Sequence, residues 1–428
     1  MTSFRFLHAA DIHLDSPLTG LTGLAGIAGR VAERVRTAPR AAFEALVEQA
    51  IADQVDFLII AGDLYDGPWR DCNTGLFFAK QMGRLKQAGI PVFVLHGNHD
   101  AESQIARQLK LPLPDNVQVF VARKAQTFQL DKLNVALHGQ SFREKAVTDN
   151  LVPDYPTPVQ DAFNIGVLHT ALDGMSDHAK YAPCSLPELV AKGYDYWALG
   201  HVHQQQVLHE RPHVVFPGNL QGRHVRETGP KGAFLVTVEA GEVVDVEALT
   251  LDVVRWAVLD VDVAAAASTD DVVDLMRKAL EQAVAYADGR LLSARIVLKG
   301  RTGLHSQLVT GNEHLTDEAR FVALSLGNEV AWVERVTVQT TPVADAAALA
   351  AQEDTLGDLR GMLKEAISDE ELLGKLKEDI GKLIRKLPHD IRDGCEDEVL
   401  GAAVNGSYDA LIGLVTPYLN ARLTSEDG

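Results

Sequence analysis

The chain contains few cysteines, and their spacing excludes two kinds of site. Its 428 residues include only three, Cys72, Cys184 and Cys395. None of them forms a CxxC pair, so the sequence supports neither a disulfide framework nor a thiolate zinc site. Any metal ion that this chain binds must therefore be held by nitrogen and oxygen ligands.

Long apolar runs are also missing. No stretch reaches the roughly 18 uninterrupted apolar residues that a membrane-spanning helix needs. The N-terminal segment MTSFRFLHAAD lacks the basic flank, long apolar region and cleavage site of a secretion signal. With 46% hydrophobic and 23% charged residues, the chain is expected to be a soluble, cytoplasmic protein of two or three domains with no membrane partner.

A surplus of basic residues is absent as well. The formal net charge of −19 argues against a general nucleic-acid coat, because phosphate backbones are bound by Lys and Arg. About −13 of this charge lies after residue 250 and about −6 before it. The first 250 residues are therefore much less acidic than the remainder, and a bound cation could supply positive potential there.

The first 250 residues do contain a repeated pattern of apolar runs that end in polar residues. Five such runs, at 4–10, 57–61, 92–95, 165–168 and 196–199, alternate with helical patterns. They are followed in turn by Asp11 and His13, by Asp63, by HGNHD at 96–100, by His169 and by GHVH at 200–203. Ligands of open α/β sheets lie at the carboxyl ends of the strands, so five buried strands are predicted to deliver these polar groups to one edge.

After residue 250 the pattern changes. Three strand-like runs at 256–263, 290–300 and 329–338, with helical stretches near 269–287 and 315–326, predict a small βαβαβ-like module. From about residue 346 the patterns are helical only. We therefore predict a site-bearing domain at 1–250, a small α/β capping domain at 251–345 and a helical C-terminal domain at 346–428.

One helix of the C-terminal domain has an apolar stripe. Ser368 and Glu371 form a capping box at its start, and Pro388 ends it. Between them, apolar residues follow heptad spacing: Leu373, Leu376, Ile380, Leu383 and Leu387. This stripe either packs inside its own domain or docks on another protein, and the sequence leaves both options open.

The polar strand ends supply what a pair of divalent metal ions requires. Such a centre needs a bridging carboxylate, several imidazoles and further oxygen ligands in one pocket. In an extended segment, residues i and i+2 point to the same side, so the DxH and HxH triplets can each place two ligands together. Each motif alone has a structural explanation, whereas the ordered set from five strand ends predicts a dinuclear centre. The seven candidate ligands are Asp11, His13, Asp63, Asn98, His169, His201 and His203.

This ordered set resembles the signature of the calcineurin-like metallophosphoesterase superfamily. Five segments together resemble its SbcD and YhaO branch of bacterial DNA repair exonucleases: GDLYDGP at 62–68, HGNHD at 96–100, YAPCSL at 181–186, GYDYWALGHVH at 193–203 and FPGNLQGRHVRETGPKG at 216–232. The resemblance covers about residues 4–250, and the remainder only in outline. It implies an α/β fold in which a two-sheet sandwich is flanked by helices (α-β-β-α), with a small α/β cap and a C-terminal helical domain.

The resemblance also implies a role for each ligand. One metal would be held by Asp11, His13, Asp63 and His203, and the other by Asp63, Asn98, His169 and His201, with Asp63 as the bridge. Two such cations lower the pKa of bound water, so that a hydroxide bridging them can attack a phosphodiester near neutral pH. Manganese is the preferred metal that the resemblance implies, although iron and zinc suit these nitrogen and oxygen ligands equally well.

Several residues beside the ligands have other expected roles. His99 is expected to stabilise the transition state or to protonate the leaving oxygen, with Asp100 fixing its tautomer, unless it only packs under the turn. His8 and His96 are expected to be structural. The glycine-rich segment GRHVRETGPKG is predicted to contact DNA phosphates through its basic residues, Arg223, Arg226 and Lys231.

The sequence thus predicts a metal-dependent hydrolase, a DNA exonuclease or endonuclease of DNA repair. The resemblance implies DNA and an SMC-type ATPase as partners, the latter held through the C-terminal helices, and leaves room for a homodimer. One alternative is a small-molecule phosphodiesterase or nucleotidase on the same core, which the long extension after residue 250 disfavours. Another is a non-catalytic DNA-repair scaffold, which the presence of all seven ligands and His99 disfavours.

Overall fold

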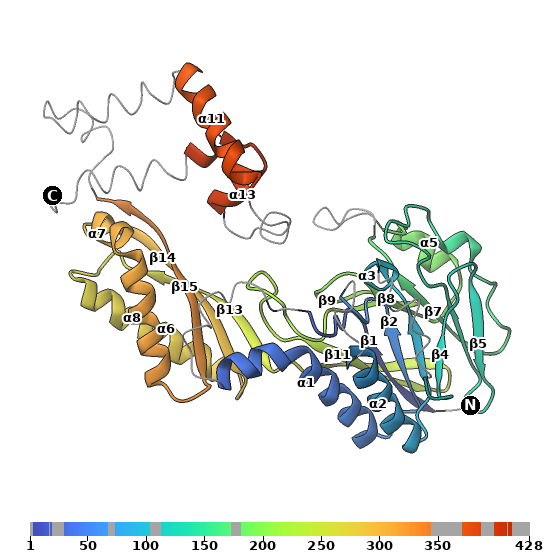
Figure 1. Cartoon of the computed structure of the whole chain (residues 1–428). Coiled ribbons are helices and arrows are strands. Elements are labelled where there is room, and N and C mark those ends of the chain that lie inside the picture. Colours follow the sequence, from blue (N-terminus) through green and yellow to red (C-terminus); the bar gives the residue numbers. More distant parts are fainter. Residues whose placement is uncertain are drawn as a thin grey trace, which may run out of the picture. The chain divides into compact units, whose positions relative to one another are not determined.

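The computed structural model describes residues 3–16, 18, 30–66, 73–102, 113–172, 181–343, 370–386, 398–408 and 410–412. The chain divides into two compact units, Met1–Trp256 and Ala257–Gly428 (Figure 1). Within the described ranges, no helix is both long and apolar enough to cross a membrane. The three-domain division at residues 250 and 345 stays a prediction.

The first unit contains two six-stranded sheets. One has the order β12-β11-β1-β2-β3-β4, and the other the order β5-β6-β7-β8-β10-β9. The strands of the first sheet are β1 (Phe4–Ala9), β2 (Phe57–Ala61), β3 (Val92–Leu95), β4 (Val117–Val119), β11 (Gly232–Glu239) and β12 (Glu242–Thr250). Those of the second are β5 (Gln126–Leu130), β6 (Val135–Gly139), β7 (Phe163–His169), β8 (Tyr196–Gly200), β9 (Gln205–Glu210) and β10 (His213–Pro217).

Aromatic packing joins the two sheets face to face. Phe6 of the first sheet stacks on Phe57 with ring centroids 4.9 Å apart, and it meets Tyr196 of the second sheet edge-on at 5.2 Å. These rings belong to one fully buried cluster drawn from both sheets. Successive side chains of a strand point to opposite faces, so the alternate residues of β1 and β2 point to the outer face of the first sheet.

Two long helices cover the outer face of the first sheet, and one short helix packs on the outer face of the second (Figure 1). On the first sheet, Leu7 and Leu58 pack with Phe43 of α1 (Arg30–Ala52) and Phe78 of α2 (Asn73–Gln87). On the second sheet, the Trp197 indole donates a hydrogen bond of 2.9 Å to a backbone carbonyl of α5 (Leu186–Ala191). The short helices α3 (Asn98–Glu102) and η2 (Val152–Asp154) complete the unit. The predicted α-β-β-α sandwich is confirmed.

Strand direction places the polar strand ends together. Strands β1, β2 and β3 are parallel neighbours in the first sheet, and β7 and β8 are parallel neighbours in the second. Parallel strands present all their carboxyl ends at the same edge. The residues that follow these five strands therefore gather at one end of the sandwich.

The predicted βαβαβ module lies in the second unit, except that its first strand begins three residues earlier, at the end of the first unit. Its sheet has the order β13-β14-β15, and β14 pairs with β15 in parallel. The elements are β13 (Val254–Asp262), α6 (Thr269–Tyr286), β14 (Leu291–Thr302), α7 (His305–Thr310), α8 (Asn312–Ser325) and β15 (Ala331–Pro342). The strands and the two longer helices match the prediction, while the short helix α7 was not predicted.

Two helices are described in the C-terminal part, α11 (Glu370–Ile384) and α13 (Glu398–Val404). Along the predicted heptad stripe of α11, Leu373 and Ile380 are half-buried, whereas Leu376 and Leu383 are 44% and 66% exposed. Ser368, Leu387 and Pro388 lie outside the described residues, so the predicted ends of this helix stay predictions.

Candidate metal centre

The seven predicted ligands meet at the carboxyl ends of β1, β2, β3, β7 and β8. They form two clusters, in each of which the ligand atoms lie within 4.8 Å of one another. The Asp11 cluster consists of Asp11, His13 and His203, and the His169 cluster consists of Asp63, His169 and His201. Asn98 joins the second, because its Oδ1 lies 3.0 Å from His169 Nε2. The fold thus collects all seven side chains, and their role as ligands is a proposal.

The backbone at this end of the sandwich is strained. Four of the predicted ligands have a positive φ: Asp11 (51°), His13 (47°), Asp63 (50°) and His201 (99°). Residues with a Cβ rarely adopt this conformation, and it persists only where surrounding contacts enforce it. Here the backbone N–H groups of Asp11 and His13 donate to the carbonyls of Gly62 and Asp63, both at 3.0 Å. Such enforced strain is typical of functional sites.

Two glycines of the motifs allow the loops to approach one another. Gly62, in the GD pair, has φ +102°, and a Cβ there would overlap the His169 ring. A Cβ on Gly97, in the GNH triplet, would overlap Asp63 Oδ1. Glycine is therefore required at these positions for the strand ends of the two sheets to come together.

Asp63 lies between the two clusters. Its Oδ2 is 3.4 Å from His169 Nε2 and 4.0 Å from His13 Nε2, and its Oδ1 accepts a hydrogen bond of 2.9 Å from the His99 backbone N–H. Burial alone would raise the pKa of Asp63, but the neighbouring His169 holds it well below its usual range. Burial likewise lowers the pKa of His169, and Asp63 outweighs that effect and raises it to about 9. Asp63 is therefore ionised at neutral pH.

In the Asp11 cluster, two imidazole nitrogens and a carboxylate oxygen lie close together. His13 Nε2 lies 3.3 Å from His203 Nε2, which is 3.7 Å from Asp11 Oδ1. Burial lowers the pKa of His13 to about 4 and also lowers the pKa of His203, so both imidazoles are neutral near pH 7. Neutral imidazoles and carboxylates that converge in this way fit a divalent metal ion.

Asp66 occupies the position beside His99 that was expected for Asp100, which corrects the prediction. Asp66 Oδ1 lies 3.0 Å from His99 Nδ1. The Asp100 carboxylate instead accepts from the backbone N–H groups of Leu64, Tyr65 and Gly97 at 3.2, 2.8 and 2.9 Å. Successive residues of a helix point about 100° apart, so neighbours at the start of α3 diverge. The second Asp of GDLYD is the sequence signal for this contact.

The three predicted phosphate contacts have different surroundings. Arg223 lies beside the centre, with Nη1 3.5 Å from Asp66 Oδ1 and Nη2 3.7 Å from Glu227 Oε1. Arg226 is exposed, and its side chain makes no hydrogen bond or ion pair with the residues that the structure describes. Lys231 is only 6% exposed, and its ammonium donates 2.7 Å to the His203 carbonyl. Lys231 therefore fixes a ligand loop instead of facing DNA, a correction that its sequence context did not reveal.

His8, as predicted, has a structural environment. It is fully buried, with Nδ1 3.0 Å from the Tyr196 hydroxyl and Nε2 3.0 Å from the Leu199 carbonyl. Burial lowers its pKa to about 3. The residue therefore stays neutral and joins the two sheets below the metal centre.

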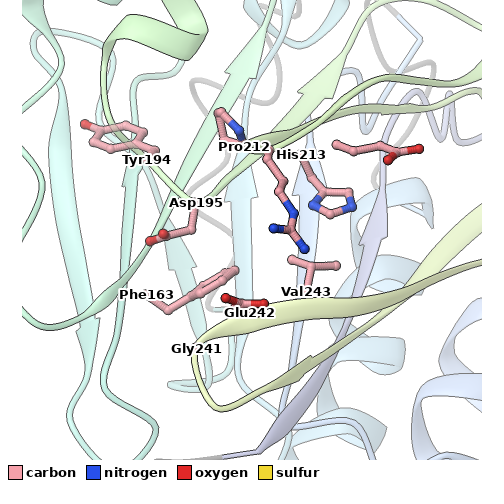
Figure 2. A pocket seen from close by; sticks show the side chains of 10 residues that line it. Phe163, Tyr194, Asp195, Pro212, His213, Gly241, Glu242 and Val243 are labelled. Carbon is pink, nitrogen blue, oxygen red and sulfur yellow. The ribbon is translucent and has the colours of Figure 1, made fainter.

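A separate hollow of about 200 Å³ lies at the opposite ends of the strands. Figure 2 shows its lining, which includes Phe163, Asp195 and His213 at the starts of β7, β8 and β10, with Glu242 at the start of β12. These are amino ends of the strands, whereas the predicted ligands follow carboxyl ends. The hollow is thus distinct from the metal centre.

Comparison with protein families supports the fold. Residues 4–205 match the family described as calcineurin-like phosphoesterase, and residues 256–341 match the middle domain of metallophosphoesterase YhaO. The two-sheet sandwich with this ordered set of metal-competent residues is therefore a calcineurin-like metallophosphoesterase domain. With its matching middle domain, the chain resembles the YhaO type within that superfamily.

Three curated relatives are similar to parts of the chain. An uncharacterized metallophosphoesterase YhaO of Bacillus subtilis is 37% identical over 247 residues, which are 57% of this chain and 59% of that protein. A DNA double-strand break repair protein Mre11 of Methanopyrus kandleri is 28% identical over 277 residues, covering 57% and 56%. An Mre11 of Aeropyrum pernix is 25% identical over 350 residues, covering 72% and 82%. The chain thus spans less than two thirds of the first two relatives.

Proposed function

We propose that this protein is a DNA phosphodiesterase that uses two divalent metal ions, most suitably manganese. The observation that supports this best is the position of Asp63. One of its oxygens lies 3.4 Å from His169 Nε2 in one cluster and 4.0 Å from His13 Nε2 in the other. A carboxylate that faces an imidazole of each cluster is suited to bridge two metals.

The two clusters support a proposed ligand set for each metal. Asp11, His13, Asp63 and His203 would hold one metal, and Asp63, Asn98, His169 and His201 would hold the other. When bound, two divalent cations lower the pKa of a bound water, and their positive charge attracts the phosphate. That local charge offsets the acidity of the chain as a whole, whose formal charge is −19.

His99 and Asp66 are proposed to deliver a proton to the leaving oxygen. The His99 side chain is 33% exposed and its Nδ1 lies 3.0 Å from Asp66 Oδ1. Burial alone would lower the pKa of His99, but the contact with Asp66 raises it above its usual value. The protonated imidazole is therefore available near neutral pH as a general acid. Arg223, next to Asp66, is placed to contact a phosphate oxygen.

DNA is the substrate that the relatives favour, because two of them are named as DNA double-strand break repair proteins. An exonuclease or endonuclease role in DNA repair, in the cytoplasm, is the corresponding proposal. We further propose an SMC-type ATPase as partner, held through the C-terminal helices. The exposure of Leu376 and Leu383, 44% and 66%, supports a docking role for α11.

The test compares two substrate classes. Purified chain with Mn²⁺ is incubated in parallel with end-labelled DNA and with nucleotide phosphodiesters, and an Asp63→Asn variant serves as the control for contaminating nucleases. The wild type is expected to cleave DNA, and the Asp63→Asn variant is expected not to. Hydrolysis restricted to the small phosphodiesters would overturn the choice of substrate, and the absence of both activities would overturn the proposed enzyme.

A further inference from the structure

The Glu227 carboxylate connects a predicted metal ligand to the loop that follows it. Its two oxygens face different partners: Oε1 lies 2.6 Å from His203 Nδ1, and Oε2 accepts hydrogen bonds of 2.7 Å from both the Asn219 amide and the Arg223 backbone N–H. Glu227 is 8% exposed and Asn219 is fully buried. The carboxylate is therefore held in one orientation.

This contact determines which nitrogen of His203 carries the proton. An ionised carboxylate only accepts hydrogen bonds, so the nitrogen facing it, Nδ1, must be the donor. The other nitrogen, Nε2, then offers its electron pair, and it points to within 3.3 Å of His13 Nε2 and 3.7 Å of Asp11 Oδ1. That is the tautomer a metal in the Asp11 cluster requires.

The same loop also fixes the backbone of His203. The Lys231 ammonium donates 2.7 Å to the His203 carbonyl. The loop from Asn219 to Lys231 therefore holds both the ring and the peptide of one ligand. From the sequence, the basic residues of this loop are predicted to bind phosphate. In the structure, its buried Glu227 and Lys231 side chains contact His203.

The two clusters are supported differently. In the Asp11 cluster, a side-chain carboxylate faces the Nδ1 of each imidazole, Glu227 at His203 and Asp66 at His13, the latter at 3.4 Å. In the His169 cluster, His169 Nδ1 lies 3.1 Å from the Ala61 backbone carbonyl. A backbone carbonyl cannot be removed by substitution, whereas a carboxylate can, so the Asp11 cluster can be weakened on its own.

We propose that Glu227 is a positioning residue that sets the tautomer of His203 and thereby controls the affinity of the Asp11 cluster for its metal. The inference rests on the proposed dinuclear function and adds a residue that governs one of its two metals. Outer carboxylates that orient ligand histidines typically contribute about 10–100-fold to metal affinity.

The variant Glu227→Gln tests this with little change in shape. The Asn219 amide and the Arg223 N–H both donate toward Oε2, so the amide oxygen of the new side chain will take that position. Its NH₂ group then faces His203 Nδ1 and donates to it, which places the ring proton on Nε2. The tautomer reverses at the nitrogen that would bind the metal.

Calorimetric titration with Mn²⁺ and electron paramagnetic resonance measure the result without reference to activity. The wild type should bind two ions and give a spin-coupled pair. In Glu227→Gln, one site should weaken by about 10–100-fold, and the other should keep its affinity and give the signal of an isolated ion. The same change at an exposed position, Glu239→Gln, should leave both sites intact.

A double variant separates positioning from a general structural role. If Glu227 acts through His203, Glu227→Gln should weaken metal binding no further in a His203→Ala background, whereas independent effects would add. Circular dichroism in chelator checks folding. If the amide variant is unfolded, Glu227→Asp is used in its place. The shorter side chain keeps a carboxylate that can accept from Asn219 but no longer reaches His203. The same selective loss of metal affinity is expected.

The outcomes are distinguishable. A wild type that does not bind two ions would overturn the proposed dinuclear function itself. Two tight ions in both the wild type and Glu227→Gln would overturn the role of Glu227 alone. Equal weakening of both sites, additive loss in the double variant, or the same loss in Glu239→Gln would also overturn it.

Discussion

Replacing Asp66 by Asn removes one charge at the point where three functional groups meet. Asp66 Oδ1 lies 3.0 Å from His99 Nδ1, 3.4 Å from His13 Nδ1 and 3.5 Å from Arg223 Nη1. Asn has nearly the same shape, so packing should be retained. The closest of the three contacts, to His99, should dominate the effect.

The magnitude follows from that contact. A hydrogen bond to a charged group contributes about 1.5–3 kcal/mol, which corresponds to about 10–150-fold in rate. The His99 side chain is 33% exposed, so solvent screening favours the lower part of this range. We therefore expect turnover of Asp66→Asn to fall by about 10–50-fold while both metals remain bound.

The pH profile provides a second readout. Burial alone would lower the pKa of His99, and Asp66 reverses this and raises it above 6.5. A raised pKa keeps the acid protonated to higher pH, so in Asp66→Asn the alkaline fall in activity should move to lower pH. Initial rates on a nitrophenyl phosphodiester with Mn²⁺ measure both effects, with the exposed Asp245→Asn as the matched control. A variant with two bound metals, a rate within twofold of wild type and an unchanged alkaline limb would refute the reasoning.

Four further changes test other parts of the molecule. Asp63→Asn removes the shared carboxylate, so metal content by mass spectrometry and turnover should fall together; a variant that kept two metals and full rate would end the dinuclear interpretation. His99→Ala should keep both metals while turnover falls by about 10²-fold or more, and loss of metal instead would show that the loop is misassigned. Burial lowers the pKa of His8 to about 3 in the folded protein, against 6.5 for an exposed histidine, so its contribution to stability is complete above pH 6.5 and is lost as pH falls. In urea unfolding with a chelator, the free energy of unfolding of the wild type should fall by about 2 kcal/mol more than that of His8→Gln between pH 7 and pH 5. Equal losses in the two proteins would contradict the lowered pKa of His8. Deletion from residue 346 should leave a soluble protein that cleaves simple phosphodiesters but no longer associates with an SMC-type ATPase; unfolding of residues 1–250 would contradict the docking proposal.

The sequence predicts that the seven polar side chains meet at one edge, because their placement follows from strand direction, and the structure brings them together there. Asp11 and His13 directly follow one apolar run, and His201 with His203 follow another, so each pair is brought to a strand end by its own strand. Each motif is local, so a single chain segment determines its geometry. The small module after residue 250 was predictable for the same reason, since its strands and helices alternate with clear apolar periods.

Contacts that depend on turns could not be predicted in this way. Asp66 follows Asp63 by three residues in a turn, and only the folded loop shows that it reaches His99 before the adjacent Asp100 does. Lys231 is predicted from the sequence to contact DNA phosphates and Glu227 has no predicted role, yet in the structure both side chains contact His203. Periodicity cannot report such directions, because the side chains involved lie outside regular elements.

Anomalous diffraction from crystals grown with Mn²⁺ would locate the two metals that are proposed to share Asp63. Two anomalous peaks are expected on either side of Asp63, one contacting Asp11, His13 and His203, the other contacting Asn98, His169 and His201. His13, Asp66 and His99 form a third group of ligand atoms within 4.8 Å of one another, which offers a rival position. A single peak, or a peak at that third group in place of one of the two, would contradict the dinuclear centre.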